Sequence, residues 1–426
     1  MINRICRGGP LSARILDFMR VLRAGAHRCA PTFLMIISCA FPVMAVEVKP
    51  VVNAQLLGGQ YFYNGSDNAF GAVASLSAAP YMQFNDRWSL VPLYSGSYKG
   101  TKQVTDLVGG GTLFQESQDH TGSLKAIRSF ANGLKLKAVG AYGAEFLRET
   151  VDEKWGKGLY DNRRLSGGAE SEWSWDKERY VRLAYDYYTI RFPNYASLES
   201  QGSSMGLGRE LNAPDVLDNK NHALTLGGQA GLPGNGFAEA AFSQTWRRFG
   251  SQHLVDLSGD LISELRGDQI QTASLQGTWP VLLDSNLKLF TSVGYSRSRV
   301  YSNQNHYDAQ KVVFNPNYYA YIQQSISNQW TLAVGEDPWT IGLNWTVSRQ
   351  KYADRLTQDA LGNYETGRTR VDGASIGLQF AYPIAAGFRL NALTQLGWSD
   401  SNNHNNQVYQ YHYNTQTYLM GFSYAY

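Results

Sequence analysis

Cysteines, charges and long apolar runs are all scarce in this sequence. The three cysteines, Cys6, Cys29 and Cys39, lie near the N-terminus. If the chain is cleaved after Ala45, the remainder has no cysteine, which excludes disulfides and thiolate metal sites from it. Charged residues make up 17% of the chain, and no run of eighteen apolar residues follows residue 45. The second absence excludes a membrane-spanning helix from that part of the chain.

The residues that are abundant are glycine (42), tyrosine (27) and aromatic residues as a class (13%). Strands with one lipid-facing and one water-facing side average to this composition. A soluble all-β sandwich averages to it as well, so composition leaves both classes open. The first 45 residues hold six of the 38 basic and one of the 35 acidic residues, which leaves 32 and 34 in the rest. The basic excess therefore lies in the first 45 residues and does not indicate a nucleic-acid partner.

The first 45 residues have the organisation of a signal peptide. Residues 1–30 are rich in arginine, and residues 31–45 read PTFLMIISCAFPVMA, a short apolar run that ends with Val43 and Ala45 at the positions a signal peptidase reads. We therefore expect a signal peptide over 1–45 and a single domain over 46–426. A start at Met19 would give a leader of ordinary length. A competing interpretation takes residues 36–39 as a lipoprotein box, with Cys39 lipidated.

The last sixteen residues, YHYNTQTYLMGFSYAY, alternate with a period of two. The large apolar side chains fall on one face, at Tyr418, Met420, Phe422, Tyr424 and Tyr426. The opposite face is mostly small or polar, as in a strand with two unlike environments. This stretch resembles the last strand of a Gram-negative outer-membrane β-barrel. The resemblance implies that these five residues are an insertion signal, and that the chain meets outer-membrane lipids and the barrel assembly machinery.

The same alternation recurs from about residue 51 to the end, interrupted by turn residues such as those at 85–87, 131–133 and 233–236. We predict an all-β fold, an antiparallel up-and-down transmembrane barrel of about sixteen strands (roughly 14–18). Closure removes the unpaired strand edges that hydrocarbon cannot satisfy. An even count places both termini on the periplasmic side with the short turns. Longer loops are expected outside, at 64–69, 100–118, 149–162, 193–219, 250–267, 302–310, 353–368 and 401–409. Residues 326–339 cannot be placed in register.

Tryptophan supports this sidedness. Six of the ten tryptophans lie within a few residues of predicted short turns, at Trp88, Trp173, Trp175, Trp279, Trp330 and Trp339. Indole prefers a membrane boundary, because its ring is apolar and its N–H needs a partner. The pattern indicates a periplasmic aromatic girdle, although tryptophan can also end strands in a soluble sandwich.

The faces opposite the apolar ones carry charges of both signs. These candidate lumen-lining residues are Lys135, Lys137, Glu145, Glu170, Glu172, Arg182, Asp186, Glu239, Arg247, Lys288 and Arg389. Together they predict a wet interior, compatible with a pore whose field orders passing solutes. The alternative is a polar lining that pairs with itself and selects nothing.

Two loops could modify such a pore. The longest, 193–219, would supply Glu199, Arg209, Glu210 and Asp215 as a constriction if it folds into the lumen, or it stands outside as a solvated flap. The loop at 250–267 has leucine and isoleucine at amphipathic helical spacing, which predicts a helix on or inside the mouth.

Motifs for chemistry are not found. No histidine has the local context of an outer-membrane phospholipase, and Asp308 near His306 is only a weak imitation of a barrel protease. No phosphate loop or metal-ligand spacing is present. We therefore expect no enzyme activity, no cofactor and no metal. The leading hypothesis is a passive pore for small hydrophilic solutes, with or without self-association as a trimer. The alternatives are an export barrel for polysaccharide or protein with a periplasmic partner, and a plugged structural or adhesive surface barrel.

Overall fold

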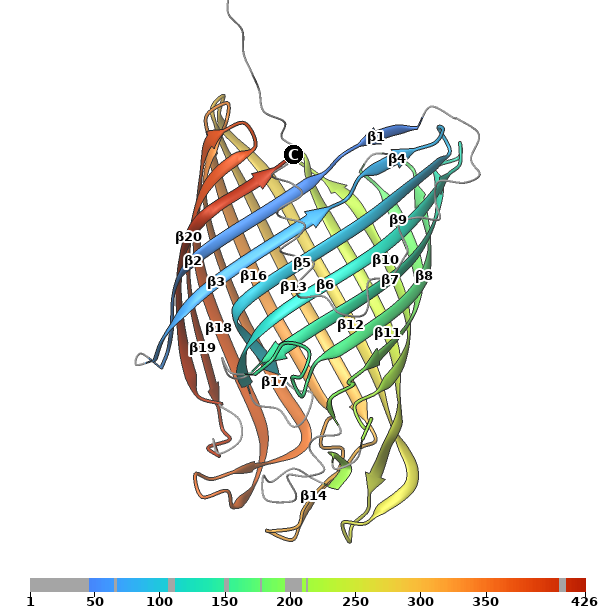
Figure 1. Ribbon diagram of the computed structural model, residues 1–426, viewed down its shortest axis with the longest axis vertical. Coiled ribbons are helices and arrows are strands. Elements are labelled where there is room, and N and C mark those ends of the chain that lie inside the picture. The colour runs from blue at the N-terminus through green and yellow to red at the C-terminus, as the bar shows by residue number, and fades with distance from the viewer. Residues whose placement is uncertain are drawn as a thin grey trace, which may run out of the picture. The chain divides into compact units, whose positions relative to one another are not determined.

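The wall of the molecule is one closed antiparallel sheet (Figure 1). The computed structural model describes residues 46–64, 67–105, 112–148, 153–176, 178–195, 209–211, 214–405 and 411–426. Within these residues, sixteen long strands pair in chain order: β2 Val52–Tyr63, β3 Asp67–Ala78, β5 Trp88–Thr105, β6 Thr112–Ser129, β7 Leu134–Arg148, β8 Asn162–Ser174, β9 Tyr180–Arg191, β10 Asn219–Leu232, β11 Gly236–Val255, β12 Leu261–Asp284, β13 Leu287–Ser302, β16 Tyr321–Val334, β17 Trp339–Gln358, β18 Tyr364–Ala385, β19 Phe388–Ser401 and β20 Tyr413–Ala425. The predicted fold class is confirmed.

Four short strands accompany the wall. Glu47–Lys49 (β1) pairs with Tyr81–Gln83 (β4), which continues β3 after a break at residues 79–80. His306–Asp308 (β14) and Val313–Asn315 (β15) form a separate hairpin in the connection between β13 and β16. One 3-10 turn, Arg209–Leu211 (η2), lies between β9 and β10. No helix in the described residues is long and apolar enough to cross a membrane.

The barrel closes where the first long strand meets the last. β2 pairs with β20 from Asn53 opposite Ala425 to Tyr63 opposite Thr415. Two glycines let these backbones approach, because a Cβ on Gly59 would collide with the carbonyl of Tyr418 and one on Gly421 with that of Leu56. The closing pairs leave neither strand with a free edge.

The seven short connections lie at the end of the barrel that holds β1 and the C-terminus (Figure 1). They fall where turn residues predict them. At the first, the Asn85 side chain accepts the N–H groups of Arg87 and Trp88, both at 2.9 Å. At the second, Gly133 has φ +82°, a left-handed conformation that favours glycine. The unregistered region 326–339 is resolved as the end of β16, a four-residue turn and the start of β17.

The connections at the other end differ from the prediction in length. β17 continues to Gln358, and β18 begins at Tyr364. Most of the loop expected at 353–368 is therefore strand. The loop expected at 302–310 instead spans residues 303–320 and contains the β14–β15 hairpin. Residues 352–358 of β17 and 364–370 of β18 are mostly polar on both faces. They lose the alternation that marks a strand, even though these strands continue.

The helix expected at 250–267 is not present, and that prediction is wrong. Leu254 lies in β11, Leu265 lies in β12, and only a turn at residues 256–260 separates the two strands. The helical spacing came from apolar residues on two antiparallel strands read as one segment. The predicted signal peptide, with Cys39, Ala45 and Met19, lies outside the described residues and stays a prediction.

Candidate functional site

The two faces of the wall differ in chemistry. Along β9, Val181, Leu183 and Tyr185 are exposed, and they alternate with Arg182 and Asp186. A hollow lined from β9, β10, β11, β12, β13 and β16 collects polar side chains, among them Arg182, Glu239 and Ser296. Side chains from six successive strands converge only on the concave side of a curved sheet. The polar face is therefore the inner face, and the exposed apolar residues cover the outside.

Charged residues from β7, β8 and β9 form a compensated ladder on the inner face. Lys135 lies opposite Glu172 and Lys137 opposite Glu170 in the strand register. The ammonium of Lys135 is 2.9 Å from Glu172, that of Lys137 is 2.6 Å from Glu170, and Lys137 also pairs with Glu172. Arg182 extends the ladder at 3.7 Å from Glu170. We call Lys135, Lys137, Glu170, Glu172 and Arg182 the inner ladder.

Three more predicted lumen residues have polar partners from neighbouring strands. Glu145 accepts a hydrogen bond from Asn162 at 3.0 Å, and Glu239 accepts one from Tyr180 at 3.4 Å. Arg247 donates to the Asn221 side chain at 3.2 Å and lies 3.8 Å from Asp268. The structure thus brings these residues together with their neighbours in pairs rather than at one point.

The remaining three lie apart from those pairs. Asp186 is half-buried in β9 on the same face as Arg182, Lys288 is exposed in β13, and Arg389 is half-buried in β19. All eleven predicted residues fall on strand positions of the polar face. That they line an open, water-filled pore stays a prediction.

A neutral polar stripe occupies β12, β13 and β16. Here hydroxyl and amide side chains bond across strands: Thr272 with Ser298 at 3.1 Å, Ser296 with Ser325 at 2.8 Å, and Gln276 with Ser292 at 3.0 Å. Sequence reasoning missed this stripe because it followed charges only. The available signal was the period-two spacing of serine and threonine on the strand face away from Leu275 and Tyr295.

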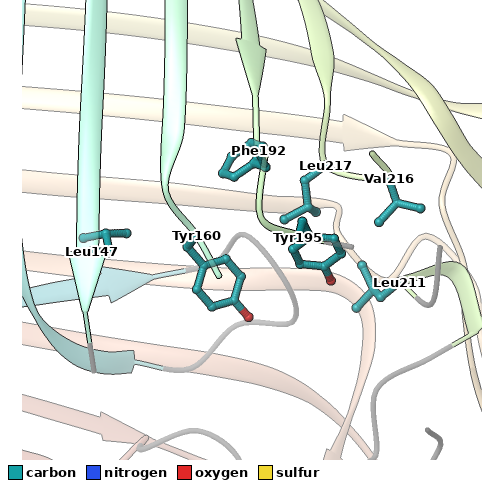
Figure 2. Packing of buried hydrophobic residues seen from close by; sticks show 7 residues of the cluster. All are labelled: Leu147, Tyr160, Phe192, Tyr195, Leu211, Val216 and Leu217. Atoms are coloured by element: carbon teal, nitrogen blue, oxygen red, sulfur yellow. The ribbon is translucent and has the colours of Figure 1, made fainter. Parts of the chain in front are cut away.

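At the loop end, apolar residues from β7 and from the connections β7–β8 and β9–β10 form a small core (Figure 2). Leu147 from β7, Tyr160 before β8, and Phe192 and Tyr195 after β9 pack with Leu211, Val216 and Leu217. Leu147 follows the polar-face positions of β7, so the packed residues lie on the inner side of the wall. The described parts of the loop predicted at 193–219, which are 193–195, 209–211 and 214–219, are therefore held at the mouth by this core.

A buried polar group fixes this loop to others. Glu210 is 1% exposed, and its Oε1 lies 2.9 Å from Nδ1 of His306 and 3.4 Å from the Tyr319 hydroxyl. Burial, and then the charge of Glu210, raise the pKa of the Tyr319 phenol well above its ordinary value, so the phenol keeps its proton and donates. Gln252 of β11 donates to the Glu210 carbonyl at 3.3 Å. Glu210 therefore holds this loop to its neighbours, and its part in a constriction stays a prediction.

The other predicted constriction residues have different positions. Arg209 is the first residue of η2, and Asp215 is exposed in a turn with φ +59°. Glu199 lies outside the described residues. His306 and Asp308 do not act on each other as a barrel protease pair would, because Asp308 accepts a hydrogen bond from the Tyr364 hydroxyl at 3.1 Å while His306 meets Glu210.

Aromatic residues mark the outer face. Trp88, Trp173, Trp175 and Trp330 are exposed near the short turns, and the rings of Trp173 and Trp175 stack with centroids 5.3 Å apart. The predicted insertion-signal residues Tyr418, Met420, Phe422 and Tyr426 are exposed as well, and Tyr424 lies on the same face of β20. Their role as a signal stays a prediction.

A closed barrel of sixteen antiparallel strands, with an apolar outer face and a polar inner face, has the architecture of an outer-membrane β-barrel. No family model matches the chain, and no curated protein matches its sequence.

Among solved structures, the chain is similar to the trimer form of OmpT, an outer membrane protein of Vibrio cholerae, at 13% identity over 90% of this chain and 100% of that one, with a TM-score of 0.44. It is similar to OccD3 of Pseudomonas aeruginosa at 9% identity over 88% and 91% of the two chains, and to OccAB3 of Acinetobacter baumannii at 9% over 89% and 99%, both with a TM-score of 0.45. Likeness at this level says nothing of function.

Proposed function

We propose that the protein is a passive channel for small hydrophilic solutes in the bacterial outer membrane. The observation that carries this proposal is the inner wall, on which the compensated inner ladder and the neutral polar stripe are both polar surfaces. Water can wet such a wall, and sixteen strands enclose more space than the filled interiors of eight-stranded barrels. The solute class follows from the wall, since the inner ladder presents little net charge and the stripe presents hydroxyl and amide groups.

The same proposal includes an orientation. The termini and the seven short turns face the periplasm, and the longer connections face outside. Single-chain bacterial barrels have this arrangement, with short periplasmic turns and longer external loops. The proposed partners are outer-membrane lipids, the assembly machinery that reads β20, and further copies of the chain.

The proposal involves no reaction. The described polar groups of the mouth are engaged in packing: Glu210 binds His306 and Tyr319, and Arg266 binds Asp268 through two nitrogens at 2.9 Å each. In this arrangement they fix loops to one another.

The test is planar-bilayer conductance of the protein purified from the cell envelope in detergent. Heat-modifiable gel mobility is the control that shows a folded barrel. We expect stable conductance steps of the size of a wide aqueous pore. A heat-modifiable barrel that stays electrically silent would overturn the proposal and favour an exporter that needs a periplasmic partner, or a plugged surface protein. Co-purification of a periplasmic protein would separate those two.

A further inference from the structure

Basic residues gather on the outer face of the barrel toward the loop end. All are exposed, and each falls on the strand positions that carry the exposed apolar residues. We call this set the basic band: Arg163, Arg191, Lys220, Arg248, Arg297, Arg299, Arg349, Lys351, Arg368 and Arg370. They come from β8, β9, β10, β11, β13, β17 and β18. The inner ladder, by contrast, belongs to the opposite face.

The basic band begins where the apolar surface ends. Exposed apolar residues lie two positions from Arg163, Arg248, Arg297 and Arg349 on their strands, toward the short turns: Leu165, Trp246, Tyr295 and Val347 respectively. Side chains two apart on a strand share a face. The band is therefore at the height at which a barrel wall passes from acyl chains to headgroups.

Within the basic band, like charges face each other in the strand register. Arg163 is directly opposite Arg191, Lys220 is opposite Arg248, and Lys351 is opposite Arg370. Like charges at directly opposed positions destabilise a sheet. Two of these pairs, Arg163–Arg191 and Lys220–Arg248, have no carboxylate of the described chain at ion-pair distance, so each offers a place for an anion from outside.

The chain itself compensates only part of this charge. Asp372 binds Arg349 at 2.6 Å and Arg370 at 2.9 Å, and Asp354 lies 3.8 Å from Arg368. For the other seven members of the basic band, the described part of the chain provides no carboxylate at ion-pair distance.

Two carboxylates lie near members of the basic band. Burial raises the pKa of Asp161 and of Asp218, and the charges of Arg163 and Arg191 respectively oppose that rise. Both carboxylates are already used by the backbone. Asp161 accepts the N–H of Leu147 at 2.8 Å, and Asp218 accepts that of Phe192 at 2.7 Å. Neither carboxylate forms an ion pair with Arg163 or Arg191 among the described residues, which leaves these arginines available to an anion from outside the chain.

We propose that the basic band binds the phosphate groups of glycolipids in the outer leaflet. Arginine binds phosphate through paired N–H groups, and closely spaced arginines suit a headgroup with more than one phosphate. A lipid rather than a free anion is the occupant because the band borders the exposed apolar wall, where the acyl chains of the same molecule lie. The inference rests on the proposed membrane location, and it does not depend on whether the channel conducts.

The test uses the protein purified in neutral detergent and a bis-phosphorylated, lipid A-type glycolipid as the probe. Bound glycolipid is counted by native mass spectrometry. The variant is Arg163→Gln/Arg191→Gln combined with Lys220→Gln/Arg248→Gln. We expect retention to fall about tenfold, because four of the phosphate-binding donors are lost. The same glycolipid without phosphates should not be retained by the unaltered protein.

The matched control is Arg87→Gln/Arg128→Gln, which removes positive charge near the short turns, where Arg128 lies over the Trp88 ring. It should retain the glycolipid. Equal loss in this control, unchanged retention in the fourfold variant, or equal retention of the dephosphorylated glycolipid would overturn the proposal. Displacement of the glycolipid by inorganic phosphate at equal concentration would assign the band to free phosphate and would also overturn it.

Two readouts keep this test separate from the channel. Heat-modifiable mobility shows that each variant has folded, and Arg191→Glu, which turns one like-charge pair into an ion pair, replaces the fourfold variant if that one is not recovered. Conductance is measured on the same preparations. A silent protein that retains glycolipid contradicts only the channel, and a conducting protein that binds glycolipid without its phosphates contradicts only the basic band.

Discussion

The inner ladder and the basic band share strands β8 and β9 but differ in how their charges are compensated. On β8, Glu170 and Glu172 face inward, opposite lysines of β7. Near the loop end of the same strand, Arg163 faces outward, opposite Arg191 of β9. The inner ladder thus carries its own counter-charges, whereas seven of the ten members of the basic band have no carboxylate of the described chain at ion-pair distance. In the channel that we propose, a wall with little net charge does not hold passing solutes. On the outer face, the proposed lipid phosphates would supply the counter-charges that the basic band lacks.

The charged residue Glu210 at the mouth adds a third case, and the three cases together show how the strength of a charge pair depends on its exposure to water. Glu210 at the mouth is 1% exposed, the Lys137 side chain in the ladder is 19% exposed, and Arg163 and Arg191 at the rim are both exposed. Charge pairs gain strength as water is excluded from them. Three variants should therefore have effects that decrease from the mouth to the ladder to the rim.

The largest effect is expected from His306→Ala. It leaves the buried Glu210 carboxylate with the Tyr319 hydroxyl as its described side-chain donor, at 3.4 Å. An unsatisfied buried polar group costs about 1–3 kcal/mol, and the loops held by Glu210 should open. We expect faster proteolysis within residues 193–219. The control is His404→Ala, which removes an exposed loop histidine that stacks on His412. Equal protection in both variants would contradict the role given to Glu210.

A smaller effect is expected from Lys137→Gln. It leaves Glu170 without its lysine and Glu172 with Lys135 only, which should cost about 1–2 kcal/mol, between the values of exposed and buried pairs. The temperature of heat-modified mobility should fall, and reversal potentials in a salt gradient should shift toward cations. Lys288→Gln removes an inner-face lysine with no ion pair among the described residues. It should shift selectivity without lowering that temperature, and an equal fall in both would argue against the ladder.

The smallest effect, and one of opposite sign, is expected from Arg191→Glu. It replaces a repulsive pair with Arg163 by an attractive one, worth about 0.2–1 kcal/mol. In neutral detergent at low salt, resistance to denaturant should rise in the order wild type, Arg191→Gln, Arg191→Glu. High salt should shrink the differences, because both charges are exposed. An order that persists at high salt would mean that packing, and not charge, sets it.

The strands and the faces of the wall could be predicted from the sequence because each depends on neighbours in the chain. Period-two alternation is a local property, and it assigned Lys137 and Arg389 to the face opposite the apolar residues. The failure at 250–267 has a local cause as well. Above the apolar layer, β11 and β12 no longer have one wet and one dry side, so Leu254 and Leu265 carried no strand signal.

The contacts between distant segments could not be predicted in this way. Glu210 and His306 lie 96 positions apart and meet only because two loops fold over the same mouth. The opposition of Arg163 and Arg191 depends on the register between β8 and β9, which the lengths of strands do not determine. The neutral polar stripe could have been predicted, since the period-two spacing of its serines and threonines is local, but only charged residues were taken as candidates for the inner face.

The pairing of β2 with β20 joins the first and last long strands, so the barrel cannot close before both are in place. Leu56, near the start of the described chain, finds its partner Phe422 only four residues before the end. Until β20 pairs with it, β2 has one edge that no other strand of the described sheet covers, and exposed strand edges invite pairing with other chains. Pairings between distant segments are also the slowest to form. The free edge of β2 must therefore be sheltered during assembly until β20 pairs with it and closes the barrel.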